Sequence, residues 1–261
     1  MIDSGLLLID KPEGPSSAQV VHRVKVLLGA KKVGHLGSLD PFASGLLLLG
    51  INEGTKVADI FLSARKSYRG IMVLGVETDS HDATGTIVQI RAVPAIGKVA
   101  LRDLERQFSG DLRQIPPMFS ALKKGGVPLY KLARQGKEVP REPRSIRVEN
   151  LRLRKLTDDE IEFELTCSRG TYVRTLAADM GKSLGCGAHL KSLRRIACGH
   201  LTVDLAVTLD ELEQRGPRMT VPLLPFEKVL GHLRAVTWEN QLVSRLRLGQ
   251  QEILRHLDKP V

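Results

Sequence analysis

The chain has 261 residues, 42% of them hydrophobic, so it is long enough for one large domain or for one domain with a small appendage. Its 39 Lys and Arg residues against 29 Asp and Glu residues give a net charge of +10, which favours a polyanionic partner, either nucleic acid or an anionic membrane surface. Apolar runs fall well short of the ~20 residues of a spanning helix, and the N-terminus is acidic where a signal peptide would be basic. We therefore expect a cytoplasmic protein that binds no membrane.

Cysteine and histidine spacing gives no sign of a metal or cofactor. The three cysteines, Cys167, Cys186 and Cys198, are an odd number without C-x-x-C spacing, and we interpret them as small buried hydrophobes. The seven histidines lack a paired zinc-binding arrangement, and no glycine-rich phosphate-binding run follows a strand pattern. We expect no metal, nucleotide or redox cofactor.

The first predicted elements are a short strand at residues 5–9, a turn at 10–14 and a helix capped by Ser16 or Ser17. Five apolar residues at helical spacing support the helix: Val20, Val21, Val24, Leu27 and Leu28. Lys11 belongs to the turn, and the residues alone indicate an ordinary exposed lysine.

Residues 34–45 read GHLGSLDPFASG and precede an apolar run at 44–51 that is typical of a strand buried on both faces. Gly34 and Gly37 permit a close or left-handed backbone path, and Pro41 biases Asp40 away from helical geometry. Asp40 should therefore project from an ordered loop. Most Asp-Pro pairs only organise their own turn, so the pair by itself does not establish a reactive carboxylate.

The next segments are predicted to be a helix at 54–64, an alternating strand at 68–76, a polar loop at 77–86 and a strand at 87–91. Tyr68 begins the first of these strands, where an aromatic residue is often simply part of the core. Glu77, Asp79 and Asp82 lack calcium-loop spacing, which favours a hydrogen-bonded turn.

A helix at 99–108 precedes a basic, proline-rich insertion at 114–147. Only Glu138 and Glu142 oppose its basic residues, and interleaved apolar anchors such as Leu122 and Leu129 distinguish it from a plain linker. This composition suits a clamp on a phosphate backbone, although a solvated charged loop is the simpler alternative.

Two alternating strands at 146–155 and 161–167 form a predicted antiparallel hairpin, followed by a helix from near Thr171 to Gly185 and a short helix at 208–215. Arg174 by itself would be a first-turn surface arginine. Leu193 by itself would be a core leucine.

Residues 35–45 resemble the signature of the TruB family of tRNA pseudouridine synthases. The resemblance is carried by His35, Gly37, Ser38, Leu39, Asp40, Pro41, Ala43, Ser44 and Gly45. Further runs match family motifs in the same order: Lys11-Pro12 with Gly14 and Ser16-Ser17, Lys66-Ser67-Tyr68-Arg69, the run 170–175, and Leu193-Arg194-Arg195. Together they cover about residues 5–215.

The resemblance implies an enzyme that isomerises uridine 55 in the T-loop of tRNA through a flipped base. It also implies an α+β fold with a mixed, mostly antiparallel central sheet flanked by helices. Asp40 would be catalytic and Arg174 would pair with it, which should keep the carboxylate ionised. His35, Tyr68, Leu193 and Lys11 would be substrate-binding: His35 fills the vacated space, Tyr68 packs on the base, Leu193 lines its pocket, and Lys11 supports the loop.

By the same resemblance, residues 1–230 would be the catalytic domain and the insertion at about 114–147 an RNA-gripping thumb. Residues 231–261 would be a short, partial PUA-like segment. The predicted RNA-binding residues of the thumb are Lys123, Lys124, Lys131, Arg134, Lys137 and Arg141.

Three questions stay open from the sequence. The protein could be a non-catalytic RNA-binding or RNA-folding protein, or a synthase acting on ribosomal RNA. The carboxylate could attack C6 of the base, attack C1′ of the ribose, or remove a 2′ proton. No heptad repeat or large apolar helix face indicates a dimer, so we expect a monomer without a protein partner.

Overall fold

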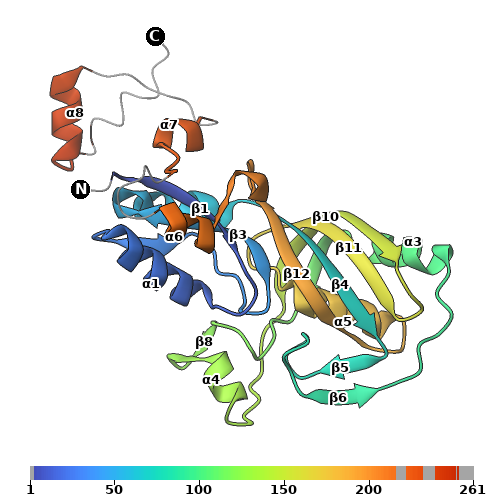
Figure 1. Ribbon diagram of the computed structural model, residues 1–261. Helices are drawn as coiled ribbons and strands as arrows, with labels where there is room; N and C mark the ends of the chain where they lie inside the picture. The colour runs from blue at the N-terminus through green and yellow to red at the C-terminus, as the bar shows by residue number, and fades with distance from the viewer. Residues whose placement is uncertain (1–2, 216–221, 232–238, 251, 253–261) are drawn as a thin grey trace. The chain divides into compact units, whose positions relative to one another are not determined.

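A computed structural model describes residues 3–215, 222–231, 239–250 and 252. The chain divides into two compact units, Met1–Leu224 and Pro225–Val261. The first unit holds all the predicted site residues (Figure 1). The described helices of the second unit are α7 (Phe226–Val229) and α8 (Asn240–Arg247).

A ten-stranded mixed sheet forms the centre of the described part of the first unit. Its strands are β1 (Gly5–Lys11), β2 (Val33–His35), β3 (Ser44–Ile51), β4 (Lys66–Leu74), β7 (Gly110–Gln114), β10 (Arg144–Lys155), β11 (Glu160–Cys167), β12 (Ala188–Cys198), β13 (Leu201–Thr202) and β14 (Val207–Thr208). The main order is β14-β1-β3-β12-β4-β11-β10-β7, with β2 paired to β3 and β13 to β12. Among the described strands of this sheet, only β1–β14 and β12–β3 pair in parallel, which confirms the predicted mixed, mostly antiparallel sheet.

Helices and two small sheets surround the central sheet. The helices of this unit are α1 (Ser17–Leu28), α2 (Ala58–Ser63), α3 (Lys98–Gln107), α4 (Leu129–Ala133), α5 (Val173–Ser183) and α6 (Leu209–Arg215), with 3-10 turns at Asn52–Val57 and Val203–Leu205. The small sheets pair β5 (Val76–Thr78) with β6 (Ile87–Ile90), and β8 (Lys123–Lys124) with β9 (Val127–Pro128). Ser16 caps α1 through a capping box with Gln19, as one of the two predicted caps.

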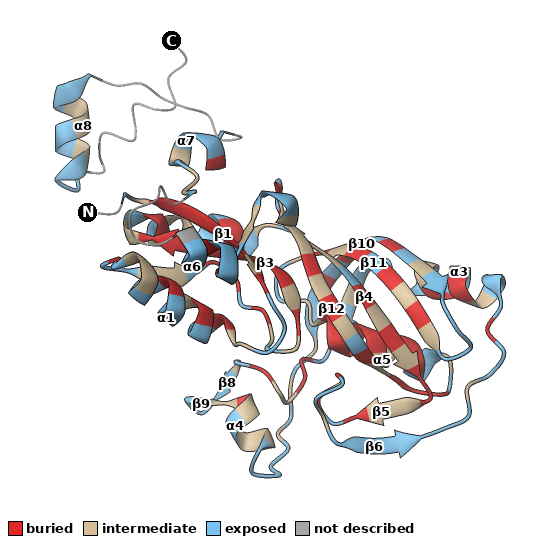
Figure 2. Ribbon diagram, in the orientation of Figure 1, coloured by how far each residue is buried: buried red, intermediate tan, exposed pale blue. Residues whose placement is uncertain are grey.

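The core lies on the central strands. Leu46, Leu47, Leu48 and Leu49 are all buried, so β3 is covered on both faces as its apolar run predicts. Figure 2 shows buried residues along β1, β3, β12 and β4 and on α5, which packs against β12. Strand β6 is exposed along its whole length.

One central strand was not predicted. Residues 188–198, which the sequence marks only as motif positions, form β12 between β3 and β4. Two irregularities in the β12–β4 register, after Leu190 and after Arg195, break the regular alternation that identifies a strand in sequence. The helix predicted from Thr171 begins at Val173, because Tyr172 is still extended.

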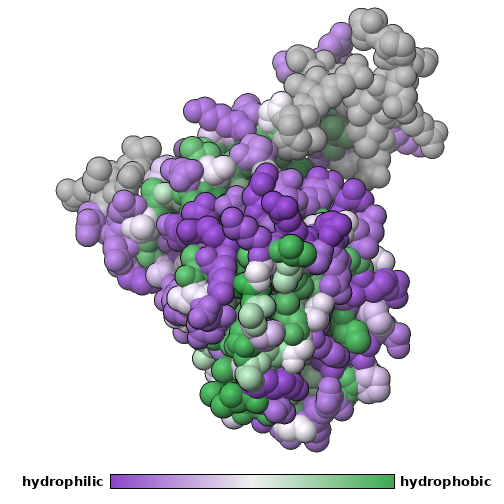
Figure 3. Space-filling model, turned by 90° about the vertical axis from the view of Figure 1, so that its right-hand side faces the viewer, coloured by the Kyte–Doolittle hydropathy of each residue, from purple (hydrophilic) through white to green (hydrophobic). Residues whose placement is uncertain are grey.

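Apolar side chains are exposed on β6 and at the start of α3. They are Ile87, Val88, Ile90 and Val99. Figure 3 faces this side of the molecule and shows apolar areas within a hydrophilic surface.

Candidate active site

Lys11 holds the loop that carries Asp40. Its side chain is 0% exposed at the end of β1, and Nζ donates to the carbonyl oxygens of Pro12 (2.8 Å), Pro15 (2.9 Å) and Pro41 (3.3 Å). The exposed turn lysine expected from the residues alone is therefore wrong, and the loop support implied by the family motif fits this geometry. Burial lowers the pKa of Lys11 to about 8, although nearby carboxylates oppose the shift. The buried ammonium thus ties the Asp40 loop, through Pro41, to the turn that follows β1.

Ser17 and Arg195 fix the same loop from two other sides. The Ser17 hydroxyl donates to the Leu39 carbonyl (2.9 Å) and accepts from the Leu39 amide (2.8 Å). The Arg195 guanidinium is buried and donates to the carbonyls of Gly37 (3.0 Å) and Ser38 (3.2 Å). The resemblance includes Ser17 in a motif that supports this loop, whereas Arg195 is only one residue of a matched motif and had no predicted role.

Asp40 forms an ion pair with Arg174 in the first turn of α5. Arg174 Nε lies 3.3 Å from Asp40 Oδ2, and the side chains are 6% and 43% exposed. Among the described residues none donates a hydrogen bond to the Asp40 carboxylate, so its oxygens are available to a substrate. Arg174 also donates to the carbonyls of Ser80 (3.3 Å) and Phe119. The surface arginine expected from the residues alone is therefore wrong, because Arg174 is buried beside the Asp40 carboxylate.

Opposing effects act on the Asp40 carboxyl. Burial raises its pKa above the ordinary aspartate value, the Arg174 guanidinium lowers it, Asp82 raises it and Lys11 lowers it, in decreasing order of size. The net direction is upward. The cations beside Asp40 therefore limit a shift that burial alone would make larger.

A second carboxylate near Arg174 comes from Asp82, in the 77–86 loop. It is 3% exposed, and its Oδ2 lies 3.7 Å from Arg174 NH1. Its Oδ1 accepts from the Ser80 hydroxyl (2.7 Å) and from the Thr84 amide (3.0 Å). The hydrogen-bonded turn predicted for this loop is confirmed. The sequence pattern did not reveal that the turn aims one carboxylate oxygen at Arg174.

Tyr68 and Leu193 lie on adjacent strands of the sheet. Tyr68 on β4 is opposite Arg195 on β12, and Leu193 on β12 is opposite Gly70 on β4. Leu193 is 6% exposed. Burial raises the pKa of Tyr68 to about 12, with the Arg195 guanidinium opposing the shift. His35, the last residue of β2, is exposed.

Gln114 connects the start of the insertion to the start of α5. Its side-chain amide donates to the Tyr172 carbonyl (3.1 Å) and accepts from the Tyr172 amide (2.9 Å). Arg174 lies over the Tyr172 ring, 5.7 Å from its centroid. A buried glutamine of this kind has no local sequence signal, because its partner is 58 residues away.

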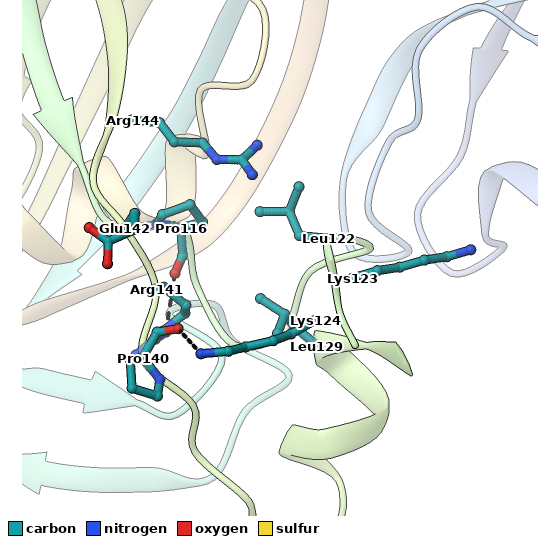
Figure 4. A pocket seen from close by; sticks show the side chains of 9 residues that line it. All are labelled: Pro116, Leu122, Lys123, Lys124, Leu129, Pro140, Arg141, Glu142 and Arg144. Carbon is teal, nitrogen blue, oxygen red and sulfur yellow. Dashed lines mark hydrogen bonds between the residues drawn. The ribbon is translucent and has the colours of Figure 1, made fainter. Parts of the chain in front are cut away.

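The basic insertion connects two strands of the sheet, β7 and β10, which pair with each other. Gln114 at the end of β7 is opposite Arg144 at the start of β10, so residues 144–147 belong to a strand and the excursion is shorter than predicted. Residues 116–144 include β8, β9 and α4 and border a cavity of about 180 Å³ (Figure 4). Its lining residues are Pro116, Leu122, Lys123, Lys124, Leu129, Pro140, Arg141, Glu142 and Arg144.

Three of the six predicted thumb residues border this cavity: Lys123, Lys124 and Arg141 (Figure 4). Arg141 is engaged within the chain, since it donates to the Pro116 carbonyl (3.1 Å). The other three, Lys131, Arg134 and Lys137, are exposed and lie outside the cavity lining.

Within the described residues, no helix is long and apolar enough to cross a membrane, and no group of three or more His, Cys, Asp and Glu side chains could hold a metal ion. All three cysteines are buried and free, as predicted.

Two family models match most of the chain. The N-terminal domain of the TruB family pseudouridylate synthases matches residues 25–173, and the tRNA pseudouridylate synthase B C-terminal domain matches residues 174–230. A solved structure of a Cbf5-Nop10-Gar1 complex is similar, with a TM-score of 0.73 and 26% identity over 94% of this chain and 67% of that chain. Fold and site thus define a pseudouridine synthase, an enzyme of the isomerase class.

Curated relatives called tRNA pseudouridine synthase B extend the match along the chain. That of Geobacter sulfurreducens is 46% identical over 94% of this chain and 81% of its own length. That of Burkholderia mallei is 44% identical over 97% of this chain and 84% of its own length. The chain belongs to the TruB family.

Proposed function

We propose that this protein converts uridine 55 in the T-loop of tRNA to pseudouridine, with Asp40 as the catalytic carboxylate. The observation that carries the proposal is the partly exposed Asp40 carboxylate 3.3 Å from the buried Arg174 guanidinium. The names of the curated relatives support tRNA as the substrate class. The net charge of +10 is consistent with an RNA partner.

The reaction breaks the bond from ribose C1′ to N1 of the base, rotates the base and joins C1′ to C5, while C5 loses its proton and N1 gains one. It changes no oxidation state. Asp40 acts at C6 of the base, at C1′ or at the 2′ proton, and each route begins from the ionised carboxylate. Arg174 favours that ionised form in a site where burial works against it.

The target base leaves its stack to reach Asp40, at a cost of a few kcal/mol. Tyr68 offers a ring for stacking, which contributes ~1–3 kcal/mol per base. Burial raises the pKa of its phenol to about 12, which favours the protonated form at neutral pH. Leu193 borders the base, and His35 fills the space that the base vacates.

The thumb holds the RNA backbone in this proposal. Lys123, Lys124, Lys131, Arg134 and Lys137 are exposed and carry positive charge that phosphates attract. Arg141 shapes the thumb through its bond to the Pro116 carbonyl.

We assign residues 1–230 to the catalytic domain. We also propose that the protein is a monomer. The PUA-like assignment of 231–261 falls largely outside the described residues. Helix α8 is its main described element.

The Asp40→Asn variant tests the function with a T-arm hairpin as substrate. We expect a loss of at least about 10³-fold in turnover with RNA binding retained, because the amide keeps the shape and removes the charge. Asp59→Asn, at an exposed position on α2, is the matched control and should turn over like the parent. Modified positions are mapped chemically.

Ribosomal RNA fragments form the second arm of the test. Modification of those fragments in preference to the T-arm would overturn the proposed substrate. Full turnover by Asp40→Asn would overturn the proposed role of the carboxylate.

A further inference from the structure

Arg195 occupies the junction of the two strands that bear the site. On β12 it is opposite Gly45 of β3 on one side and opposite Tyr68 of β4 on the other. Gly45 is the last residue of the Asp40 loop and lies at the start of β3, and Tyr68 is the proposed stacking residue. Arg195 therefore lies between the strand that continues the Asp40 loop and the strand that carries Tyr68.

The Arg195 side chain extends this link into the loop. Nε donates to the Leu46 carbonyl (2.7 Å), while NH1 and NH2 donate to the carbonyls of Ser38 (3.2 Å) and Gly37 (3.0 Å). A planar guanidinium can hold three carbonyls in one fixed arrangement, whereas a lysine ammonium cannot reproduce that fork. The loop before Asp40 and the strand after it are thereby joined through one rigid group.

Arg195 carries a charge that the fold does not neutralise locally. It is 2% exposed, and among the described residues it forms no ion pair. Its neighbour Arg194, in contrast, is paired with Asp10 at 2.6 Å and is partly exposed. Burying an unpaired cation is costly, so an apolar side chain would serve the sheet better if packing were the only requirement.

We propose that Arg195 is a positioning residue of the isomerisation, which fixes the Asp40 loop relative to Tyr68. It acts through the Gly37 and Ser38 carbonyls and does not touch the reacting atoms. This inference rests on the proposed catalytic role of Asp40.

The test compares Arg195→Lys and Arg195→Gln with the control Arg194→Gln. We expect both Arg195 variants to lose ~10²-fold in single-turnover rate at saturating T-arm hairpin, since a misplacement of about 1 Å has an effect of that size. The affinity for the hairpin should change little. Arg194→Gln should keep the parent rate, because its partner Asp10 lies outside the loop.

Hydrogen exchange distinguishes positioning from general support of the fold. In both Arg195 variants, faster amide exchange should be confined to residues 34–45, with β4, β11 and β12 still protected. Exchange that spreads through those strands, or loss of cooperative unfolding in both variants, would overturn the proposal. A parental rate in Arg195→Lys would also overturn it, because charge alone would then suffice.

Asp40→Asn separates this inference from the proposed function. An active Asp40→Asn variant rejects the function whatever Arg195 does. An inactive Asp40→Asn variant together with fully active Arg195 variants rejects only the positioning role.

Discussion

At the scale of single residues, the ionised form of Asp40 that the proposed reaction needs is the form that lowers the stability of the fold. Burial raises the folded-state pKa of Asp40, so the folded protein favours the protonated carboxyl relative to the unfolded chain. The stability linked to this group is present at low pH and is lost as pH rises through the raised pKa. An ionised Asp40 at neutral pH therefore costs folding free energy, which is a common feature of active sites.

The Asp40→Asn variant should consequently unfold at a temperature no lower than the parent at neutral pH. The advantage should shrink as pH falls, because the parent carboxyl is then protonated. Calorimetry at several pH values measures both effects. A lower melting temperature for Asp40→Asn at neutral pH would mean that the Arg174 pair outweighs the cost of burial.

Arg174 should set the acidic limb of the pH–rate profile. Because its guanidinium lowers the pKa of Asp40, Arg174→Gln should move that limb toward neutral pH and reduce the maximal rate. Single-turnover rates measured across the acidic pH range locate the midpoint of this limb. An unchanged limb with full turnover would contradict the idea that the pair keeps Asp40 ionised.

At the scale of elements, the site depends on the close approach of β3 to β12. Gly45 has a φ of +98°, and a Cβ there would lie 2.3 Å from the Arg195 carbonyl oxygen. No side chain fits without moving one strand. The glycine that ends the Asp40 loop therefore also allows β12 to pair with β3.

Gly45→Ala should lower the free energy of unfolding by more than ~3 kcal/mol, because strain at positive φ of ~1–3 kcal/mol adds to the clash. Gly14→Ala is the control, since Gly14 also has positive φ, +105°, but open space around its Cβ position. It should cost only the backbone strain. Urea titrations measure both variants, and equal losses would show that the approach of β12 adds nothing.

At the scale of the whole molecule, the net charge predicts how RNA affinity should respond to salt. A chain with a net charge of +10 should release counterions on binding, so affinity should fall steeply as salt rises. The exposed lysines Lys123 and Lys124 of β8 are placed to contribute to this effect.

The double variant Lys123→Ala and Lys124→Ala should reduce the slope of log affinity against log salt by about 1.5. Each lost phosphate contact contributes ~0.7–0.9 to that slope, and the variant removes two lysines. Lys98→Ala, exposed at the start of α3, is the control and should leave the slope nearly unchanged. Binding of the T-arm hairpin is titrated over a range of potassium chloride. An unchanged slope in the double variant would remove β8 from the RNA contact surface.

The sequence by itself determined the features that depend on near neighbours. The apolar run of β3, a serine cap at the start of α1 and the hairpin of β10 and β11 follow from local pattern and from chain connectivity. Motif order was also sufficient to indicate the TruB family and the loop around Asp40.

Only the tertiary structure decided which polar side chains are buried around that loop. Lys11 and Arg174 look like surface cations in sequence, and Arg195 is only one residue of a motif, yet all three are buried. Whether a cation can be buried depends on the acceptors that surround it, and the Gly37 carbonyl that receives Arg195 is 158 residues away. The position of β12 was hidden for the same physical reason, since strand pairing is set by contacts between distant segments.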